Sequence, residues 1–363
     1  MKWAVQKLEE IVSIKTGKLD SNAAVPNGQY PFFTCDPQTL AINTYAYDTE
    51  AVLLAGNNAS GNYTAKYYHG KFNAYQRTYI IESIDKGKLD IHYFLYALNE
   101  QLALLKSISS GSTTKFLTMS MLKPLSVPCP TISVQRRIAS ILSAYDDLIE
   151  NNRRQIKLLE EAAQRLYREW FVELRFPGHE GVKVVDGVPE GWMKFCLKDI
   201  CKTKTGKKDA NFGCDDGAYP FFTCAQAPIK APSYSFDCSA VILAGNGDFN
   251  VKLYRGKFEA YQRTYVLSPA NTEYLFLLYN AVSRNMNVLT KGASGSTIKF
   301  LTKGMIDSIE LLIPSSQLLT TYNQNSEALQ KSIEALHRKV ALAVEARDRL
   351  LPKLMNHEME VML

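Results

Sequence analysis

Polar residues that could contact a nucleic acid recur in pairs along this chain of 363 residues. Gln76-Arg77 and Gln262-Arg263 stand between tyrosines in the repeated hexapeptide Ala-Tyr-Gln-Arg-Thr-Tyr. Glutamine can form two hydrogen bonds with adenine, and arginine can pair with guanine or with a phosphate. The Gly-Lys steps that begin at Gly17 and Gly206 offer backbone N–H groups and a lysine, which suit a phosphate. These residue types predict contacts to DNA bases and to the DNA backbone.

Further candidates lie in two other repeated segments. The small-residue loops 110–115 and 294–299 carry hydroxyls and a lysine that could approach a DNA backbone. The copies differ most between Asn57 and His69 and between Asn246 and Arg255, where the second copy is about three residues shorter. Variable polar residues on a common scaffold suit sequence discrimination. The predicted DNA-binding residues are Lys18, Asn57, Asn58, Lys66, Gln76, Arg77, Ser112, Thr113 and Lys115 in the first copy, and Lys207, Lys208, Asn246, Lys252, Gln262, Arg263, Ser296, Thr297 and Lys299 in the second.

Each motif alone also fits a turn, a solvated strand pair or a linker. Its recurrence at matching spacing favours a functional role, because the polar loops are kept as faithfully as the core strands within one chain.

Catalytic and cofactor-binding signatures are absent from the sequence. There is no phosphate-binding Gly-x-x-x-x-Gly-Lys-Ser/Thr loop, no dinucleotide-binding Gly-x-Gly-x-x-Gly, and no Asn-Pro-Pro-Tyr-like methyltransferase element. The five histidines do not recur between the copies, and solvation explains Asp146-Asp147 and Asp215-Asp216. We therefore expect a non-catalytic chain with no bound cofactor and no metal.

The elements that position these residues are duplicated. A block from Leu8 to Leu117 returns from Leu197 to Leu301, at an offset that falls from about 189 to about 184 residues. Continuous apolar runs predict strands at 51–55 and 240–244, and alternating apolar residues predict strands at 75–81 and 261–267. Apolar spacing predicts helices at 91–105 and 273–289. Each copy is thus expected to be an α+β domain with a curved or highly bent sheet.

A seven-residue apolar repeat follows each copy. From Ser133, a plausible N-cap, about five heptads predict a helix of roughly 40 residues and about 60 Å, which Arg175–Gly178 should end. Asn152 lies within the apolar stripe, where it could pin the register or sit at a solvated edge. A similar helix should follow the second copy, with Pro352 kinking or ending it. Chain order predicts an antiparallel pair with one domain at each end, about a two-fold axis.

These elements divide the chain into four segments. They are a first α+β domain at 1–132, a central helix and linker at 133–189, a second α+β domain at 190–316, and a C-terminal helix at 317–363.

Composition is consistent with a globular protein of the cytoplasm. The net charge of +6 permits a nucleic acid as partner without requiring one. Seven cysteines without a Cys-x-x-Cys pair favour free thiols, and we expect Cys35 and Cys224 to be buried in apolar strands. No stretch approaches the roughly 18 consecutive apolar residues of a membrane span, and the first residues lack a secretion signal.

Taken together, these features resemble the specificity subunit of type I restriction–modification systems. The resemblance covers nearly the whole chain. It rests on the Tyr-Gln-Arg and Gly-Ser-Thr elements and on Gln135–Ile138, Ala163–Tyr167, Trp170–Val172, Phe176–Glu180, Val188–Trp192 and Arg347–Met355. One departure is Asn356-His357-Glu358, where the family commonly has a small residue and glycine.

The resemblance implies a division of labour. Each domain would read one half of a bipartite site in double-stranded DNA, and the paired helices would set the distance between the halves. Two modification subunits would supply adenine N6 methylation with S-adenosylmethionine, and motor-nuclease subunits would supply restriction with ATP and Mg²⁺. The helical pair is the expected docking surface, with candidates Arg136, Arg153, Arg154, Glu160, Glu161 and Arg168, although a solvated face also explains them. Because the two copies are alike, we expect a nearly palindromic target.

Two other classes stay open at this point. One is a coiled-coil scaffold whose end domains bind protein or glycan. The other is a self-sufficient nuclease or methyltransferase, for which Mg²⁺ or S-adenosylmethionine would be needed by the chain itself.

Overall fold

The computed structural model describes residues 3–109, 114–293 and 299–359. Contacts divide the chain into two compact units, unit 1 (Met1–Asn152 with Lys339–Leu363) and unit 2 (Arg153–Arg338). Two 40-residue helices, α5 (Ile132–Phe171) and α9 (Ser316–Met355), each contribute one half to each unit. The compact units therefore do not coincide with the four segments of the sequence, because the long helices pack with both domains.

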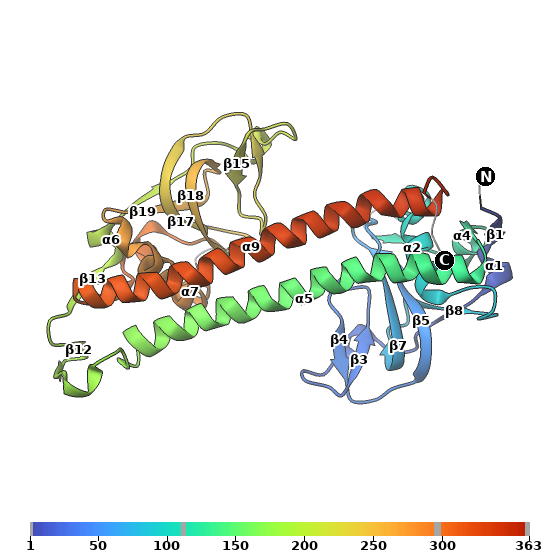
Figure 1. The fold of residues 1–363 in the computed structure, drawn as a ribbon, viewed down its shortest axis with the longest axis horizontal. Coiled ribbons are helices and arrows are strands. Elements are labelled where there is room, and N and C mark those ends of the chain that lie inside the picture. The colour runs from blue at the N-terminus through green and yellow to red at the C-terminus, as the bar shows by residue number, and fades with distance from the viewer. Residues whose placement is uncertain (1–2, 110–113, 294–298, 360–363) are drawn as a thin grey trace. The chain divides into compact units, whose positions relative to one another are not determined.

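Most of the remaining elements recur in the same order in both units (Figure 1). Unit 1 contains β1 (Val5–Lys7), α1 (Leu8–Ile11), β2 (Val12–Thr16), β3 (Tyr30–Phe33), β4 (Leu40–Ile42), β5 (Tyr47–Ala55), β6 (Asn57–Asn58), β7 (Ala65–Ala74), β8 (Thr78–Ser83), α2 (Ile91–Asn99), α3 (Leu102–Ile108), β9 (Lys115–Phe116), α4 (Met119–Leu122) and β10 (Ser126–Pro128). Unit 2 contains β11 (Val184–Val185), β12 (Val188–Pro189), β13 (Met193–Cys196), α6 (Leu197–Ile200), β14 (Cys201–Thr205), β15 (Tyr219–Phe222), β16 (Ile229–Ala231), β17 (Phe236–Ala244), β18 (Val251–Ala260), β19 (Thr264–Pro269), α7 (Leu275–Gly292), α8 (Lys303–Asp307) and β20 (Glu310–Ile313). Unit 2 adds β11 and β12, has an isolated bridge in place of the β6–β9 pair, and has one helix, α7, where unit 1 has α2 and α3.

Each unit is built on one six-stranded sheet. The strand order is β2-β8-β5-β7-β3-β4 in unit 1 and β14-β19-β17-β18-β15-β16 in unit 2. All neighbours are antiparallel except β3 with β7 and β15 with β18, which are parallel. In unit 1, β7 pairs with β5 from Tyr47, the first residue of β5, to Leu54. β8 pairs only with the other end of β5, from Val52 to Ala55. Only residues 75–77 connect β7 to β8, so the sheet must bend strongly, which confirms the predicted α+β domains with bent sheets.

The apolar run of β5 is buried on both faces of the sheet. Val52 and Leu54 pack in the cluster that contains α2, whereas Ala51 and Leu53 pack with Phe72 on the opposite face. The corresponding strand of unit 2, β17, is divided in the same way between two clusters. This explains why the sequence of both strands is continuously apolar rather than alternating.

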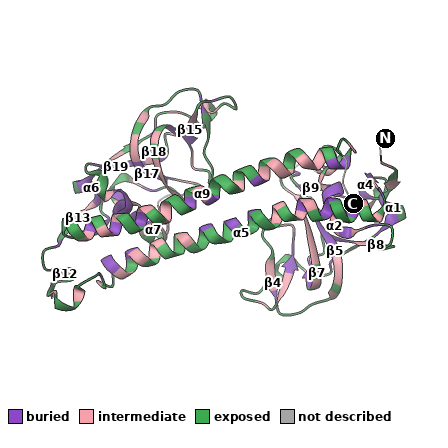
Figure 2. Ribbon diagram, in the orientation of Figure 1, coloured by how far each residue is buried: buried purple, intermediate pink, exposed green. Residues whose placement is uncertain are grey.

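The long helices run antiparallel within each unit. In unit 1 the first turns of α5 (Ile138 and Leu142) share a core cluster with the last turns of α9 (Leu354 and Met355). In unit 2 the last turns of α5 (Trp170 and Phe171) share a cluster with the start of α9, at Tyr322. Figure 2 shows buried positions recurring along both helices between exposed ones. Asn152 is 4% exposed, so the solvated-edge interpretation of this residue is wrong.

Several boundaries differ from the sequence prediction. α5 begins at Ile132, and the carbonyl of Thr131 accepts the N–H of Gln135, so Thr131 rather than Ser133 precedes the helix. α9 continues for three residues past Pro352 to Met355, so the proline does not end the helix. The predicted helix 91–105 is interrupted after Asn99, whereas α7 is continuous.

Two assignments of polar side chains also change. Asp146 is not merely solvated, because it accepts hydrogen bonds from Tyr96 and Arg347. Cys35 and Cys224 are only partly buried and lie just after β3 and β15, where their thiols contact the neighbouring turn. No disulfide links the seven cysteines, which are all free thiols.

Candidate nucleic-acid interface

The repeated Gln-Arg pair lies in a tight turn between two strands. We call residues 75–78 of unit 1 and 261–264 of unit 2 the Gln-Arg turn. Gln76 and Arg77 fall between β7 and β8, so the strand predicted to begin at Tyr75 begins instead at Thr78. Both side chains are exposed, as are those of Gln262 and Arg263. A turn projects these side chains away from the sheet, where a strand would have placed one of them on each face.

Two other repeated segments of the chain hold this turn from either side. In unit 1 the N–H of Gly17 donates to Thr78 O over 3.1 Å, and the N–H of Gly56 donates to Arg77 O over 2.8 Å. In unit 2 the same bonds join Gly206 to Thr264 O (3.1 Å) and Gly245 to Arg263 O (2.9 Å). The segment that follows the small-residue loop joins as well, through Leu117 N–H to Gly56 O and Leu301 N–H to Gly245 O, both 2.8 Å. The repeated polar motifs therefore meet at one end of each sheet.

The glycines at these positions are required by close backbone packing. A Cβ on Gly17 would lie well within 3.0 Å of Ala74 O, and a Cβ on Gly56 would meet Arg77 O in the same way. Gly206 and Gly245 face the same obstacles in unit 2. The expectation that the glycine N–H groups are available to a phosphate is wrong, since both are used inside the domain. Lys18 and Lys207, which follow these glycines, are exposed and remain available.

An aspartate orients the glutamine in both copies. Nε2 of Gln76 donates to Oδ1 of Asp20 over 2.7 Å, and Nε2 of Gln262 donates to Oδ1 of Asp209 over 2.6 Å. A carboxylate can only accept, so this bond fixes which end of the carboxamide is the nitrogen. Among the residues that the structure describes, the carbonyl oxygen and the second N–H of each glutamine have no partner and can meet a base edge. Sequence reasoning missed the two aspartates, although they recur three residues after Gly17 and Gly206.

The arginines of the turn are unpaired. Within residues 3–109, 114–293 and 299–359, neither the guanidinium of Arg77 nor that of Arg263 has a hydrogen bond or an ion pair. An exposed guanidinium beside an oriented carboxamide is suited to a phosphate or to a guanine edge.

Other predicted residues have internal partners. Lys66 donates to Asp36 O (3.2 Å) and Thr39 Oγ1 (3.1 Å), and its repeat equivalent Lys252 donates to Ala225 O (2.9 Å). Burial lowers the pKa of both ammonium groups, against the opposing charges of Asp36 and Asp248. These lysines tether the loop after β3 or β15. This arrangement does not test their predicted contact with DNA. Such a contact would compete with the hydrogen bonds that each lysine makes to the loop.

The asparagines next to the glycines are partly occupied. Oδ1 of Asn58 accepts from the N–H groups of Ser60 (2.9 Å) and Asn62 (3.2 Å), which shapes a local turn. Oδ1 of Asn246 accepts from the thiol of Cys224 over 2.9 Å. Asn57 is only partly buried, and its backbone pairs with that of Phe116. The predicted variable loop is therefore shorter than expected, since β7 and β18 already begin at Ala65 and Val251.

The last candidates flank the small-residue loops. Lys115 lies in β9 opposite Asn58, and Lys299 is exposed. Lys208 places its ammonium 4.3 Å from the ring centre of Phe212. Ser112, Thr113, Ser296 and Thr297 lie outside the described residues.

A second repeated cluster was not predicted from the sequence. The ammonium of Lys71 lies 4.6 Å from the ring centre of Tyr45, which packs 5.0 Å from Tyr30. In unit 2, Lys257 lies 4.9 Å from Tyr234, which packs 4.8 Å from Tyr219. Bonding to the tyrosine side chain raises the pKa of both lysines. The signal was present in the repeat, but the residues of each cluster are spread over three segments.

Comparison with known proteins decides the family. The family model described as "Type I restriction modification DNA specificity domain" matches residues 1–161 and 189–345. The chain belongs to this family. It carries two tandem specificity domains, in agreement with the two units of the structure.

Individual relatives agree with this assignment. The type I restriction enzyme EcoDI specificity subunit of Escherichia coli is 42% identical over 150 residues, which is 41% of this chain and 33% of that protein. The MjaIX specificity subunit of Methanocaldococcus jannaschii is 26% identical over 296 residues, 74% of this chain and 68% of that protein. The crystal structure of a type I S subunit from M. genitalium has the same fold, with a TM-score of 0.66, 18% identity, and coverage of 97% of this chain and 96% of that one.

Neither a metal site nor a membrane-spanning helix is found in the described part of the chain. Among the described residues, no group of three or more histidine, cysteine, aspartate and glutamate side chains is arranged to hold a metal ion. No helix in the described ranges combines the length and the apolar character needed to cross a membrane.

Proposed function

We propose that this chain is the DNA-reading specificity subunit of a type I restriction–modification complex and that it is not itself a catalyst. Each unit reads one half of a bipartite site in double-stranded DNA through its Gln-Arg turn. The observation that carries the proposal is the pair of equivalent turns, each with an oriented glutamine and an unpaired arginine. Such a pair of readers on one chain suits a target that is itself in two halves.

The chemistry is assigned to partner subunits. Two modification subunits methylate adenine at N6 with S-adenosylmethionine, and restriction subunits use ATP and Mg²⁺ to translocate and cleave. We propose the cytoplasm as the location, since DNA and these cosubstrates are there. The exposed surface of α5 and α9 is the proposed docking site for the modification subunits. Several of the predicted docking residues already have partners within the chain: Arg136 pairs with Asp90 (3.9 Å), Glu161 with Lys157 (3.9 Å) and Arg168 with Glu173 (3.2 Å).

The two readers should have similar preferences. Because the Gln-Arg turns carry the same residues, we propose an interrupted, nearly palindromic target. Differences between its halves are assigned to residues 57–64 and 246–250, where the copies diverge.

DNA binding by the complex purified with its modification subunits tests the proposal. Replacing Arg77 by Ala should cost about 1–3 kcal/mol on the recognised sequence if the guanidinium pairs with a base. An equal loss on all sequences would assign Arg77 to a phosphate instead. Replacing Lys18 or Lys207 by Ala should weaken all sequences and flatten the dependence of affinity on salt. A complex that does not bind DNA would refute the proposal, as would turnover by this chain alone with Mg²⁺ or S-adenosylmethionine.

The spacing of the half-sites should depend on the long helices. A helix of 40 residues is about 60 Å long at 1.5 Å per residue, and one turn of DNA is about 34 Å. Recognition centres one to two DNA turns apart suit this length. Deleting one heptad from both α5 and α9 should shorten the accepted spacer or abolish binding, and an unchanged spacer would contradict the idea.

A further inference from the structure

An arginine-centred network closes the space between the helices in unit 1. Arg347 on α9 bonds Asp146 on α5 (2.6 Å) and its own neighbour Asp348 (2.7 Å). The hydroxyl of Tyr96, on α2, donates to the second oxygen of Asp146 over 2.6 Å. Three elements are thus joined at the carboxylate of Asp146, which accepts from both Tyr96 and Arg347.

The same positions in unit 2 carry smaller or neutral side chains. α5 and α9 have equal lengths and start 184 residues apart, and the first residues of α2 and α7 are also 184 residues apart. This offset places Ala163 where unit 1 has Arg347, and Asn280 where it has Tyr96. Gln330 replaces Asp146, and Gln164 replaces Asp348. Arg347 and Tyr96 thus have much smaller counterparts in unit 2, although each aspartate is replaced by a longer glutamine.

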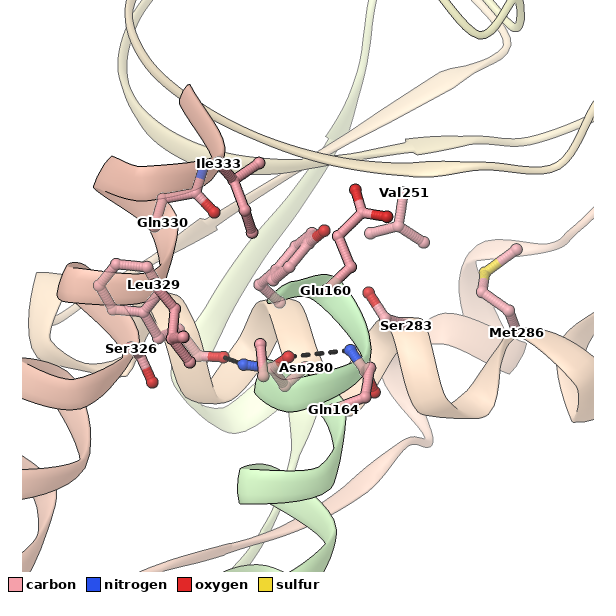
Figure 3. A pocket seen from close by; sticks show the side chains of 13 residues that line it. Glu160, Gln164, Val251, Asn280, Ser283, Met286, Ser326, Leu329, Gln330 and Ile333 are labelled. Atoms are coloured by element: carbon pink, nitrogen blue, oxygen red, sulfur yellow. Dashed lines mark hydrogen bonds between the residues drawn. The ribbon is translucent and has the colours of Figure 1, made fainter. Parts of the chain in front are cut away.

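A pocket of about 340 Å³ occupies the vacated space (Figure 3). Ala163, Gln164, Asn280 and Gln330 all line it, together with apolar side chains that include Phe276 and Ile333. Its volume lies within the range of small-molecule sites. All lining residues belong to unit 2.

Hydrogen bonds leave a carbonyl acceptor on each of two glutamines in this pocket, beside the second N–H of each carboxamide. Nε2 of Gln164 donates to Oδ1 of Asn280 over 2.8 Å, as the dashed line in Figure 3 shows, and Nε2 of Gln330 donates to Glu334 over 2.9 Å. In the part of the chain that the structure describes, the carbonyl oxygens of both glutamines have no partner. Asn280 is saturated, because its nitrogen donates to Phe276 O and to the Tyr322 hydroxyl.

A carboxylate stands at the rim of the pocket. Glu160, which replaces Val344 of the other helix, reaches the pocket from α5 and has no hydrogen bond or ion pair among the described residues. Partial burial raises the pKa of its carboxyl group, and the charge of His337 opposes that effect. Unit 2 therefore has an acid and two carbonyl acceptors at a place where unit 1 supplies its own arginine.

We propose that this pocket binds a guanidinium group, carried by arginine or a related alkylguanidine, with Glu160 as counter-ion and the carbonyl oxygens of Gln164 and Gln330 as acceptors. The five N–H donors of a guanidinium match such a set, and the apolar wall accommodates the alkyl stem. The guanidinium can come from a free small molecule or from an arginine side chain of a partner protein, since both present the same group. This site is separate from the Gln-Arg turn and does not depend on the function proposed for it.

Calorimetric titration of the full chain with L-arginine tests the proposal. L-citrulline is the control ligand, because it has the same shape and no charge. We expect arginine to bind in the micromolar to millimolar range, and citrulline to bind at least about tenfold more weakly, the equivalent of about 1.4 kcal/mol for the lost charge. No binding of arginine at millimolar concentration, or equal binding of both ligands, would overturn the proposal.

Two substitutions assign the binding to this pocket. Glu160→Gln should weaken arginine about tenfold, whereas Glu161→Gln on the adjacent exposed carboxylate should not. Ala163→Arg should fill the pocket from within and abolish binding while preserving or raising the melting temperature. If Glu160→Gln leaves the affinity unchanged, arginine binds elsewhere and the proposed site is wrong.

Unit 1 provides a positive control. Arg347→Ala should open an equivalent space beside Asp146, and arginine, but not citrulline, should then restore part of the lost melting temperature. Repeating the titration on the complex with modification subunits identifies the source. Unchanged affinity supports a free ligand, and blocked binding supports an arginine of the partner subunit.

Discussion

Replacing Asp20 by Asn is expected to reduce the selectivity for one base of one half-site, on the DNA-reading role proposed above. Asp20 accepts from Nε2 of Gln76 over 2.7 Å and so forbids the inverted carboxamide. An asparagine side chain at this position would offer both a donor and an acceptor, and Gln76 could then present either its oxygen or its nitrogen to the base. Adenine would no longer be distinguished by the order of donor and acceptor on its edge.

The size of the effect follows from what the bond restrains. The terminal torsion of glutamine is broad and roughly two-fold. Releasing it from the aspartate therefore reduces the population of the binding orientation, and with it the affinity, by about a factor of two. Fixing a free glutamine side chain costs up to about 1.5–2 kcal/mol in conformational entropy. The hydrogen bond to the aspartate already restricts the side chain, so part of this cost does not arise on binding. We expect a loss of about 1 kcal/mol on the preferred sequence, or roughly fivefold in affinity. Less loss is expected on sequences that carry another base at that position.

The assay compares binding of the purified complex to a library that varies each position of both half-sites. Asp20→Asn should change the base preference at one position of one half-site, and Asp209→Asn should do so in the other half. In a Gln76→Ala background, Asp20→Asn should have no further effect on base preference. A uniform gain in affinity for all sequences, with a steeper salt dependence, would refute the reasoning, because it would mean that Asp20 acts only by its charge.

Three further predictions concern stability. Gly56→Ala should destabilise unit 1 by about 1–3 kcal/mol in urea unfolding, because its Cβ would collide with Arg77 O, whereas Gly181→Ala, which meets nothing, should have little effect. Arg347→Ala should lower the free energy of unfolding by about 1–2 kcal/mol, because it leaves Asp146 without its partner. Arg349→Ala removes only an exposed pair with Glu345 on the same helix and should lower it less. Equal decreases for the two variants would argue against the network. Arg255 lowers the pKa of Glu327 through two hydrogen bonds, and this pair should stabilise the fold by at most about 1 kcal/mol. The stabilisation should be fully present above the usual glutamate pKa of about 4.3 and should vanish as the pH falls through the lower pKa of the folded state. A stability difference between Arg255→Ala and the unmodified chain that does not change from about pH 6 to about 2 would contradict this.

The repeat made much of the fold predictable. The apolar run 51–55 and its copy predicted two central strands, and the heptads predicted two helices of roughly 40 residues, each of which has 40 in the structure. Periodicity reports the face that a segment buries, and tertiary packing agrees with it here. The turn at Gln76 was missed, because its flanking tyrosines alternate as a strand would.

The site was predictable by position more than by role. The repeat singled out Gly17, but its function is close packing against Ala74 rather than binding through its N–H, and only the folded chain shows that neighbour. Lys66 and Arg77 look alike as basic residues in a polar segment. One is tethered and half-buried, whereas the other is exposed and unpaired, because β7 turns Lys66 toward the loop after β3. Asp20 was overlooked because its partner lies 56 residues away.

Mapping of methylated adenines in cells that carry this chain with its modification subunits tests the central claim most directly. The account predicts one interrupted motif with two similar half-sites on opposite strands, which disappears when the gene for this chain is deleted. A motif that persists without the chain, a contiguous motif, or two unrelated half-sites would contradict the account of two equivalent readers on one polypeptide.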